Sequence, residues 1–251
     1  GYGVAVDSND NIYVVGETGV VGTGIGHLTK LDKYGALVWT KTFEVTESST
    51  TLTRLMAIEI DSNDNIYTAG YFDDGTDEKY ILVKYNTSGV VQFAKKYVYT
   101  NKTNYNVVDL AISPNGNDIY LGWGATTNAF PPHSLKAARF IMKLNSSGVQ
   151  QWLKAVGSNT YAEYGYQGNI VASNSNVWTS SRTAVALDDA SASHYVPGVT
   201  KLAASNGNFS AIRMMNDAEY QNVAHSTIGG AYYDVTADRV YQAFAARSNS
   251  Y

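Results

Sequence analysis

Short apolar runs separated by polar turns recur along the whole chain. The first example is Val4–Tyr13, in which an apolar run, the turn residues Asp-Ser-Asn-Asp-Asn and a second apolar run follow one another. Two β-branched apolar runs around such a turn predict a β-hairpin. Four further copies follow, and the aromatic residues that close the five copies are Tyr13, Tyr67, Tyr120, Trp178 and Tyr241.

A second repeated unit lies between these copies. It begins with a lysine in an apolar run and continues through a turn glycine to an aromatic residue, as in Lys30–Trp39. The aligned lysines are Lys30, Lys84, Lys143 and Lys201, which are 54, 59 and 58 residues apart. The aromatic residues of the first unit advance by 54, 53, 58 and 63 residues. The shared period indicates a single repeat that contains two hairpins.

Two hairpins per repeat predict an all-β protein built from four-stranded antiparallel sheets, which is the β-propeller architecture. No segment shows a sustained period of 3.6 residues. The apolar runs Val4–Val6 and Leu110–Ile112 predict central strands that are buried on both faces.

We therefore expect residues 1–251 to form a single β-propeller, with approximate repeats at 1–54, 55–107, 108–166, 167–224 and a partial repeat at 225–251. Nine hairpins predict eighteen strands, or about four and a half blades. Since half a blade does not close a ring, we expect the ring to be completed by strands outside this range or by a partner. The chain is accordingly expected to be a segment of a longer protein.

The composition narrows the classes of function. Acidic residues number 22 and basic residues 18, so the net charge is −4 and nucleic acid is not an expected partner. The chain has no Cys, which excludes disulfides and thiolate chemistry. No run has the length of a membrane span and no signal peptide is visible, so we expect no membrane insertion.

Gly3–Gly16 reads GVAVDSNDNIYVVG and resembles the G-x-A-V-D-x-x-G-N-x-Y-V-x-G signature of NHL-like and bacterial SBBP β-propeller repeats. Lys30–Trp39 resembles the K-x-[DN]-x-x-G-x-x-x-W half of the same repeats. Asp10 and Asp64 stand where these repeats usually have a turn glycine. The resemblance implies a propeller of the kind found in secreted, cell-surface or virion proteins, and it implies no single activity.

Two acidic or amide-rich patterns have the residue types of a cation site. The strings Asp7-x-Asn9-x-Asn11 and Asp61-x-Asn63-x-Asn65 have the spacing of oxygen ligands in a calcium loop, but a hairpin turn explains them better. The second pattern is the cluster Asp73, Asp74, Asp77 and Glu78, which we interpret as a solvated acidic loop with a weak alternative as a metal site. No cofactor is expected.

Catalytic motifs are lacking from the sequence. The four histidines fall in different repeats, and no nucleophile elbow or carboxylate pair is visible. The prediction from the sequence is therefore that the chain is not an enzyme, although propellers can assemble a site from several blades.

The connections between hairpins are longer than those within them, and in an up-and-down blade they emerge on one face. The predicted long connections are 44–53, 97–106, 124–138, 157–167 and 182–197. Aromatic rings on such loops suit sugar or protein recognition, although they can instead pack under their own loops. The candidate ligand-binding residues are Tyr99, Tyr105, Trp123, Phe130, Tyr161, Tyr164, Tyr166 and Tyr195.

The function expected from the sequence is a non-catalytic β-propeller module of an extracellular or virion-surface assembly. It would bind a glycan or a protein through its long-loop face, or it would build the assembly itself by self-association. The alternative is an extracellular lyase or hydrolase that acts on polysaccharide at the propeller axis. A central pocket lined by acidic or basic groups would favour the enzyme, and an aromatic, uncharged rim would favour binding.

Overall fold

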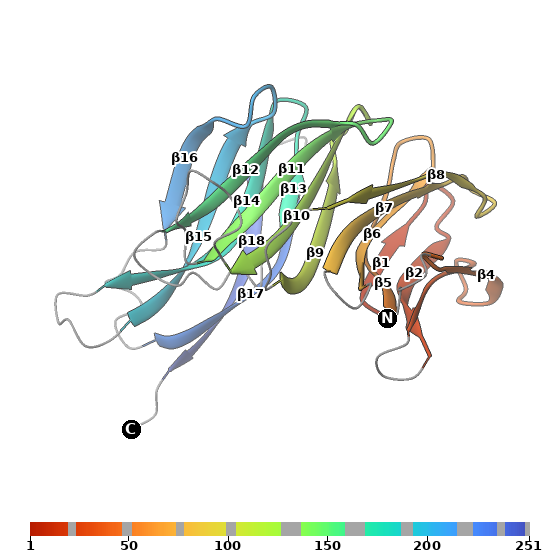
Figure 1. Cartoon of the computed structure of the whole chain (residues 1–251), viewed down its shortest axis with the longest axis horizontal. Coiled ribbons are helices and arrows are strands. Elements are labelled where there is room, and N and C mark those ends of the chain that lie inside the picture. Colours follow the sequence, from red (N-terminus) through yellow and green to blue (C-terminus); the bar gives the residue numbers. More distant parts are fainter. Residues whose placement is uncertain are drawn as a thin grey trace. The chain divides into compact units, whose positions relative to one another are not determined.

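A computed structural model of the 251-residue chain describes residues 1–19, 24–46, 52–73, 78–98, 104–126, 137–158, 169–186, 193–214, 223–234 and 239–248. These ranges contain eighteen β-strands and no helix (Figure 1). The strands are β1 (Gly3–Val6), β2 (Ile12–Thr18), β3 (Ile25–Leu31), β4 (Leu37–Phe43), β5 (Leu52–Ile60), β6 (Ile66–Asp73), β7 (Glu78–Tyr85), β8 (Val91–Tyr97), β9 (Asn104–Ile112), β10 (Asp118–Thr126), β11 (Ala137–Asn145), β12 (Gln150–Ser158), β13 (Ile170–Ala172), β14 (Asn176–Ala186), β15 (Ser193–Ala203), β16 (Phe209–Met214), β17 (Val223–Asp234) and β18 (Arg239–Ser248).

Strands that follow one another along the chain pair with one another. β1–β4, β5–β8, β9–β12 and β13–β16 form four sheets of four strands, called here the first to fourth sheets, and β17 and β18 form a fifth sheet of two. The pairings resolved in these sheets are antiparallel, as β1 with β2 and β11 with β12. The described strands therefore confirm the predicted all-β class, the four-stranded sheets and the count of eighteen strands.

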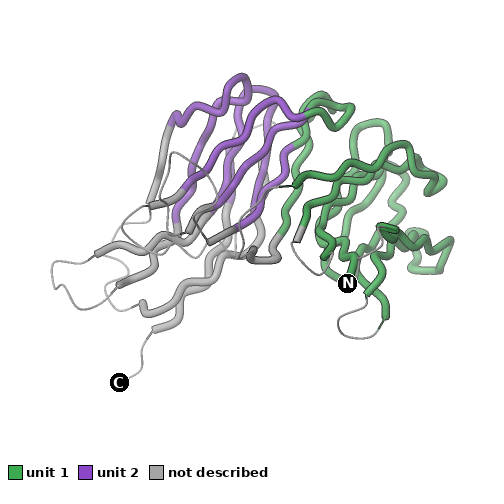
Figure 2. The backbone as a smooth tube through the Cα atoms, viewed as in Figure 1, with its two compact units in different colours: residues 1–100, 108–119, 145–149 green, residues 101–107, 120–144, 150–251 purple. Residues whose placement is uncertain are grey.

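The chain divides into two compact units (Figure 2). The first unit contains residues 1–100, 108–119 and 145–149, and the second contains residues 101–107, 120–144 and 150–251. In the first unit, the first and second sheets enclose a core of buried apolar side chains. Its members include Tyr13, Val15, Leu28, Leu55, Ile58, Ile66, Phe72, Ile81, Val83 and Tyr85.

The first and second sheets lie in the same orientation. Hydrogen bonds join Ser8 to Asp64 at one end of the two sheets, and the Thr53 amide donates to the Gly24 carbonyl oxygen at the other. The first of these is the tight-turn end, where the turns 7–11, 32–36, 61–65 and 86–90 lie. The other is the long-loop end, from which the connections 19–24, 44–51 and 74–77 leave.

The two repeated sequence motifs meet as rows of side chains across strands. Tyr13 on β2 pairs with Lys30 on β3, and Lys30 pairs with Trp39 on β4. The Lys30 ammonium lies 5.0 Å from the centre of the Tyr13 ring. The second sheet repeats this arrangement with Tyr67 and Lys84, whose ammonium lies 4.8 Å from the ring centre. The common period of the two motifs thus follows from cross-strand packing of a lysine on an aromatic ring.

Turn glycines connect neighbouring sheets. Gly89 has a φ of +76°, and a Cβ placed on it would lie 3.1 Å from the Trp39 ring of the sheet before it. Gly148 in the first unit lies in the same way over Phe93 and Lys95. In the second unit, Gly207 lies over Trp152 and Lys154. Glycine is required there by both the positive φ and the close approach of a preceding outer strand.

One prediction about the central strands is wrong. Leu110 is buried as expected, but Val4 is 65% exposed and Val6 is 55% exposed. The alternating burial along β1 places Ala5 against the core and the two valines on the opposite face of the first sheet. That face remains exposed because none of the first unit's described strands packs over Val4 and Val6.

Several strands also extend into segments predicted as long connections. Thr53 belongs to β5 and Asn106 to β9, while β14 and β15 continue to residues 186 and 193. Pro197 lies within β15, opposite Arg182. The turn residues counted as loop in the sequence are therefore partly strand ends, because ladder pairing continues wherever the partner strand is available.

Candidate functional site

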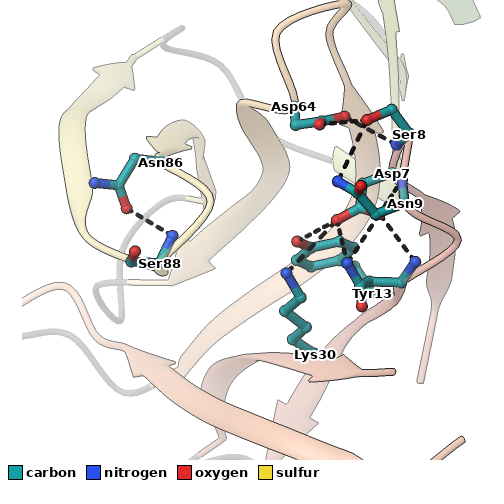
Figure 3. A network of polar contacts seen from close by, with 9 residues as sticks. Asp7, Ser8, Asn9, Tyr13, Lys30, Asp64, Asn86 and Ser88 are labelled. Carbon is teal, nitrogen blue, oxygen red and sulfur yellow. Dashed lines mark hydrogen bonds and ion pairs between the residues drawn. The ribbon is translucent and has the colours of Figure 1, made fainter. Parts of the chain in front are cut away.

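Groups of its own hairpin donate hydrogen bonds to both carboxylate oxygens of Asp7. It accepts hydrogen bonds from the backbone amides of Asn9 and Asn11, both at 2.9 Å, and from the Tyr13 hydroxyl at 2.9 Å (Figure 3). Lys30 lies 3.5 Å away. Burial acts to raise the pKa of Asp7, but the hydrogen bonds from Asn11, Tyr13 and Asn9 outweigh it, so the pKa lies below its usual value.

Asp61 repeats this turn with Asn63, Asn65 and Tyr67. The carboxylate oxygens of both turns are occupied by protein donors, which supports the interpretation as hairpin turns over that as calcium loops. Asn86 makes a third turn of the same kind, with its side-chain oxygen accepting from the Ser88 amide at 3.0 Å (Figure 3).

The two aspartates that replace a turn glycine differ in their contacts. Both Asp10 and Asp64 have positive φ, 62° and 60°. The Asp64 carboxylate accepts hydrogen bonds from the amide and the hydroxyl of Ser8, at 2.9 and 2.6 Å, and so connects the first sheet to the second. This carboxylate gives a reason for a strained residue where glycine is usual.

A polar cluster crosses the first and second sheets near the long-loop end. The Arg54 guanidinium forms an ion pair with Glu17 and donates to the Tyr71 hydroxyl, and the Tyr2 hydroxyl donates to Glu17 at 2.9 Å. Burial acts to raise the pKa of Glu17, but the hydrogen bonds from Arg54 and Tyr2 outweigh it and lower the pKa. All of these groups are satisfied by one another, so the cluster fixes the two sheets together.

Two acidic residues interact on β5 and β9, farther toward the tight-turn end of the first unit. Glu59 is next to last in β5, and Asp109 lies on β9; both belong to the first unit. Burial, together with the negative charge of Asp109, raises the pKa of Glu59 to about 8. Glu59 is therefore mainly protonated at neutral pH. The sequence contains a signal for it, since the aligned positions in the first and third repeats are Ala5 and Ala111.

A groove of about 300 Å³ opens at the long-loop end of the first unit. Its floor is apolar, with Phe72 and Ile81 buried beneath it and Phe43 partly exposed at its side. The remaining lining residues are Glu44, Val45, Thr46, Ala94, Lys95 and Lys96. These residues come from the ends of β4, β6 and β8 and from the start of β7 and of the connection after β4. The groove thus combines apolar with charged side chains.

Most of the predicted ligand-binding aromatics cannot be placed at a site. Tyr99, Phe130, Tyr161, Tyr164 and Tyr166 lie outside the described residues, and the side chains of Tyr105 on β9 and Tyr195 on β15 are likewise not described.

Trp123 is the exception, and its expected exposure on a loop is corrected. It lies within β10, is 1% exposed and stacks on Phe140 with ring centres 5.6 Å apart. The sequence prediction placed the residue with the long connection 124–138, but β10 continues to Thr126. The ring is therefore part of the core of the second unit.

The acidic candidates for a metal site are only partly described. Asp73 ends β6 and lies opposite Glu78 at the start of β7, whereas Asp74 and Asp77 lie outside the described residues. Within the described part of the chain, no three His, Cys, Asp or Glu side chains form a group that could hold a metal ion. A metal site at this loop stays a weak prediction.

Comparison with known families finds one match. The SBBP β-propeller repeat matches residues 1–22, which include β1 and β2. A search among curated proteins finds no match. The NHL-like and virion aspects of the resemblance stay predictions.

Solved structures with a similar fold include an endo-arabinase from Bacteroides thetaiotaomicron VPI-5482 and the polysaccharide lyase Uly1. The arabinase is 12% identical with a TM-score of 0.51, and the match covers 96% of this chain and 87% of that one. The lyase is 9% identical with a TM-score of 0.51, and the match covers 98% of this chain and 55% of that one. A quinohemoprotein alcohol dehydrogenase from Comamonas testosteroni matches with a TM-score of 0.46 over 35% of its length.

These structures correct the expectation that the chain is not an enzyme. The similar propellers include enzymes, so the fold is compatible with catalysis, while identities of 9 and 12% show the fold alone. No helix long and apolar enough to span a membrane is found among the described residues. Residues 1–22 match the SBBP β-propeller repeat, and the chain has the fold of a β-propeller.

Proposed function

We propose that this chain is a β-propeller module that binds a glycan at the long-loop end of its first unit, on an extracellular or virion surface. The observation that carries the proposal is the groove between Phe43 and Phe72. Sugar rings present C–H faces that pack on aromatic and aliphatic side chains, while their hydroxyls need polar groups at the rim. Both kinds of group line this groove.

The size of the groove favours a glycan over a protein. A volume of about 300 Å³ accommodates one or two sugar rings. A stable protein partner usually covers about 800 Å² of each surface, with an apolar centre of several anchoring residues. Phe43, Val45 and the small Ala94 are the apolar lining residues that keep exposure, which is too little for such a centre.

The proposal is tested by titrating the chain with neutral and acidic polysaccharides in a calorimeter. Phe43→Ala removes a ring from the wall of the groove, and we expect it to weaken binding about tenfold or more. Trp39→Ala on the same strand, outside the groove, is the matched control, and it should leave binding unchanged once folding is verified. Unaltered binding by Phe43→Ala would contradict the location of the site.

A second candidate function, hydrolysis of a polysaccharide, is favoured by Glu59 and Asp109. Glycoside hydrolysis uses a carboxylic acid that stays protonated at neutral pH together with a second carboxyl group. Burial keeps Glu59 protonated by raising its pKa to about 8, and Asp109, whose charge adds to that rise, would be the second carboxyl group. Release of reducing ends from polysaccharides, abolished by Glu59→Gln and by Asp109→Asn, would establish this activity. A wild-type chain that releases none would eliminate it.

A further inference from the structure

We infer that the free edge of β18 binds a β-hairpin whose first strand carries a lysine and whose second strand carries an aromatic residue. This inference is independent of the proposed glycan binding. In each four-stranded sheet, the second strand pairs with a neighbour on either side, as β2 pairs with β1 and β3. Among the described strands, β18 pairs with β17 alone. The fifth sheet therefore stops at the strand on which the other sheets add their second hairpin.

The sequence of β18 is typical of a strand that has a neighbour on both sides. Residues 240–246 contain no charged residue. The outermost strands of the four-stranded sheets, β4, β8, β12 and β16, each contain a lysine or an arginine. Charged residues on an edge strand prevent it from pairing with other chains, and the middle of β18 lacks this protection. The edge of β18 is therefore open to strand addition.

Tyr241 on β18 indicates which side chain the first strand of the hairpin brings. In three sheets, the aligned aromatic residue lies directly opposite a lysine of the next strand. The pairs are Tyr13 with Lys30, Tyr67 with Lys84 and Trp178 with Lys201. In each pair the ammonium lies 4.8 to 5.3 Å from the ring centre. Tyr241 is 53% exposed, and no lysine follows residue 201 in the sequence. A hairpin that pairs with β18 in the same register places its lysine over Tyr241.

The second strand of the hairpin brings an aromatic ring to the same place. Trp39 on β4 lies opposite Lys30 and packs edge-on against Tyr13, with ring centres 5.9 Å apart. Trp152 on β12 contacts Tyr120 at the same distance. Both tyrosines are buried. Because a lysine and an aromatic ring of the second hairpin cover part of Tyr13, the same two groups would cover the exposed tyrosine of β18.

The partner is not a hairpin that already belongs to the described sheets. The four hairpins that follow the second strands pair within their own sheets, and a second copy of the chain offers the same four. Pairing of β18 with β18 of a second copy would bring no lysine to Tyr241, because β18 contains none. The partner is therefore a further hairpin of the repeat, with a lysine opposite Tyr241 followed by a turn and an aromatic residue. Its main chain pairs with β18, and these two side chains give the specificity.

The test adds a synthetic peptide of residues 25–43, which form the β3–β4 hairpin, to the whole chain. Anisotropy of a fluorophore on the peptide measures binding, and amide hydrogen exchange followed by mass spectrometry locates it. We expect saturable binding that slows exchange in β18. Lys30→Met in the peptide should weaken binding about threefold, and Trp39→Ala in the peptide about tenfold. These two changes leave the folding of the chain untouched.

Variants of the chain test the same contact from the other side. Tyr241→Ala should weaken binding of the peptide about tenfold, because it removes the ring that the lysine and the tryptophan cover. Tyr241→Phe keeps the ring and should bind the peptide like wild type. Tyr34→Ala removes an exposed tyrosine from a turn of the first sheet, and as the matched control it should leave binding unchanged.

Three results would overturn the inference. The first is an absence of saturable binding, or slower exchange only outside β18. The second is unchanged binding with both peptide variants and with Tyr241→Ala, because the two side chains would then give no specificity. The third is a chain that dimerises without the peptide and already protects the amides of β18. That result would identify a second copy as the occupant of the edge.

Discussion

Replacing Glu59 with Gln should remove a pH-dependent loss of stability from the folded chain. Burial, with a contribution from Asp109, raises the pKa of Glu59 from 4.5 to about 8. A carboxyl group whose pKa is higher in the folded state gives its full stabilisation below the unfolded pKa. That stabilisation is lost as the pH rises through the folded pKa. Wild type should therefore become less stable between pH 4.5 and 8, apart from the contributions of other groups.

The size of the effect follows from the two pKa values. Each pKa unit corresponds to about 1.4 kcal/mol, so the difference between 4.5 and 8 sets an upper limit of about 5 kcal/mol. The Glu59 side chain keeps some access to solvent, which reduces the penalty for its charged form. We expect Glu59→Gln to be about 2–4 kcal/mol more stable than wild type at pH 9 and nearly equal to it at pH 4.5.

Urea unfolding monitored by tryptophan fluorescence at a series of pH values measures this difference. The difference between the two proteins cancels the titration of the groups they share. Asp109→Asn is the matched control: because burial is the larger cause of the raised pKa, this variant should keep most of the pH dependence. Parallel stability curves for wild type and Glu59→Gln from pH 4.5 to 9 would refute the reasoning.

Three further predictions concern the turns and strands of the first unit. Asp64→Gly relieves a positive φ but loses two hydrogen bonds to Ser8, whereas Asp10→Gly relieves a positive φ and loses neither. Urea unfolding should therefore show Asp64→Gly about 1–2 kcal/mol less stable than Asp10→Gly. Equal stabilities would argue against a stabilising link between Ser8 and Asp64. Gly70→Ala places a Cβ on the carbonyl oxygen of Arg54 across the β5–β6 ladder. It should lower the free energy of unfolding by about 3 kcal/mol or more and so lower the Tm. An unchanged Tm would contradict this close approach. The pKa of Asp7 is lowered in the fold, so its carboxylate stabilises the fold above the unfolded pKa of about 4, and this contribution is lost as the pH falls. Asp7→Asn should therefore lose less stability than wild type as the pH is lowered, measured by unfolding at a series of acid pH values. An equal loss in the two proteins would contradict the prediction.

The repeated parts of the fold could be predicted from sequence because identical packing demands identical residues. Tyr13 and Lys30 recur with one period since they contact each other, as do Tyr67 with Lys84 and Trp178 with Lys201, and the hairpins counted in this period predicted the number of strands. The exposure of Val4 could not be predicted, because its apolar character specifies a buried environment but not which element provides it. Trp123 shows the same limit in reverse, since it was predicted on the long connection that begins at residue 124, where the strand continues to Thr126.

The candidate sites were harder to predict for a different reason. Glu59 interrupts an aligned apolar position, which is a visible departure from the repeat, but only the fold brings Asp109 near it. The groove is formed by residues from four strands and one connection, none of which forms a motif. The predicted loop aromatics gave no information about the groove, because the groove residues lie on strands or directly after a strand.

The turn glycines give the chain a direction of assembly. Gly89 lies over Trp39, and Gly148 lies over Phe93, so in each case a later sheet covers the outer strand of an earlier one. The ribosome releases the earlier sheet first, and that sheet can form all of its own hairpins before the next one emerges. Each new sheet can then pack on the outer strand of the sheet before it, so the sheets can assemble in the order in which they are synthesised. Few strands would then be left without a paired neighbour during synthesis.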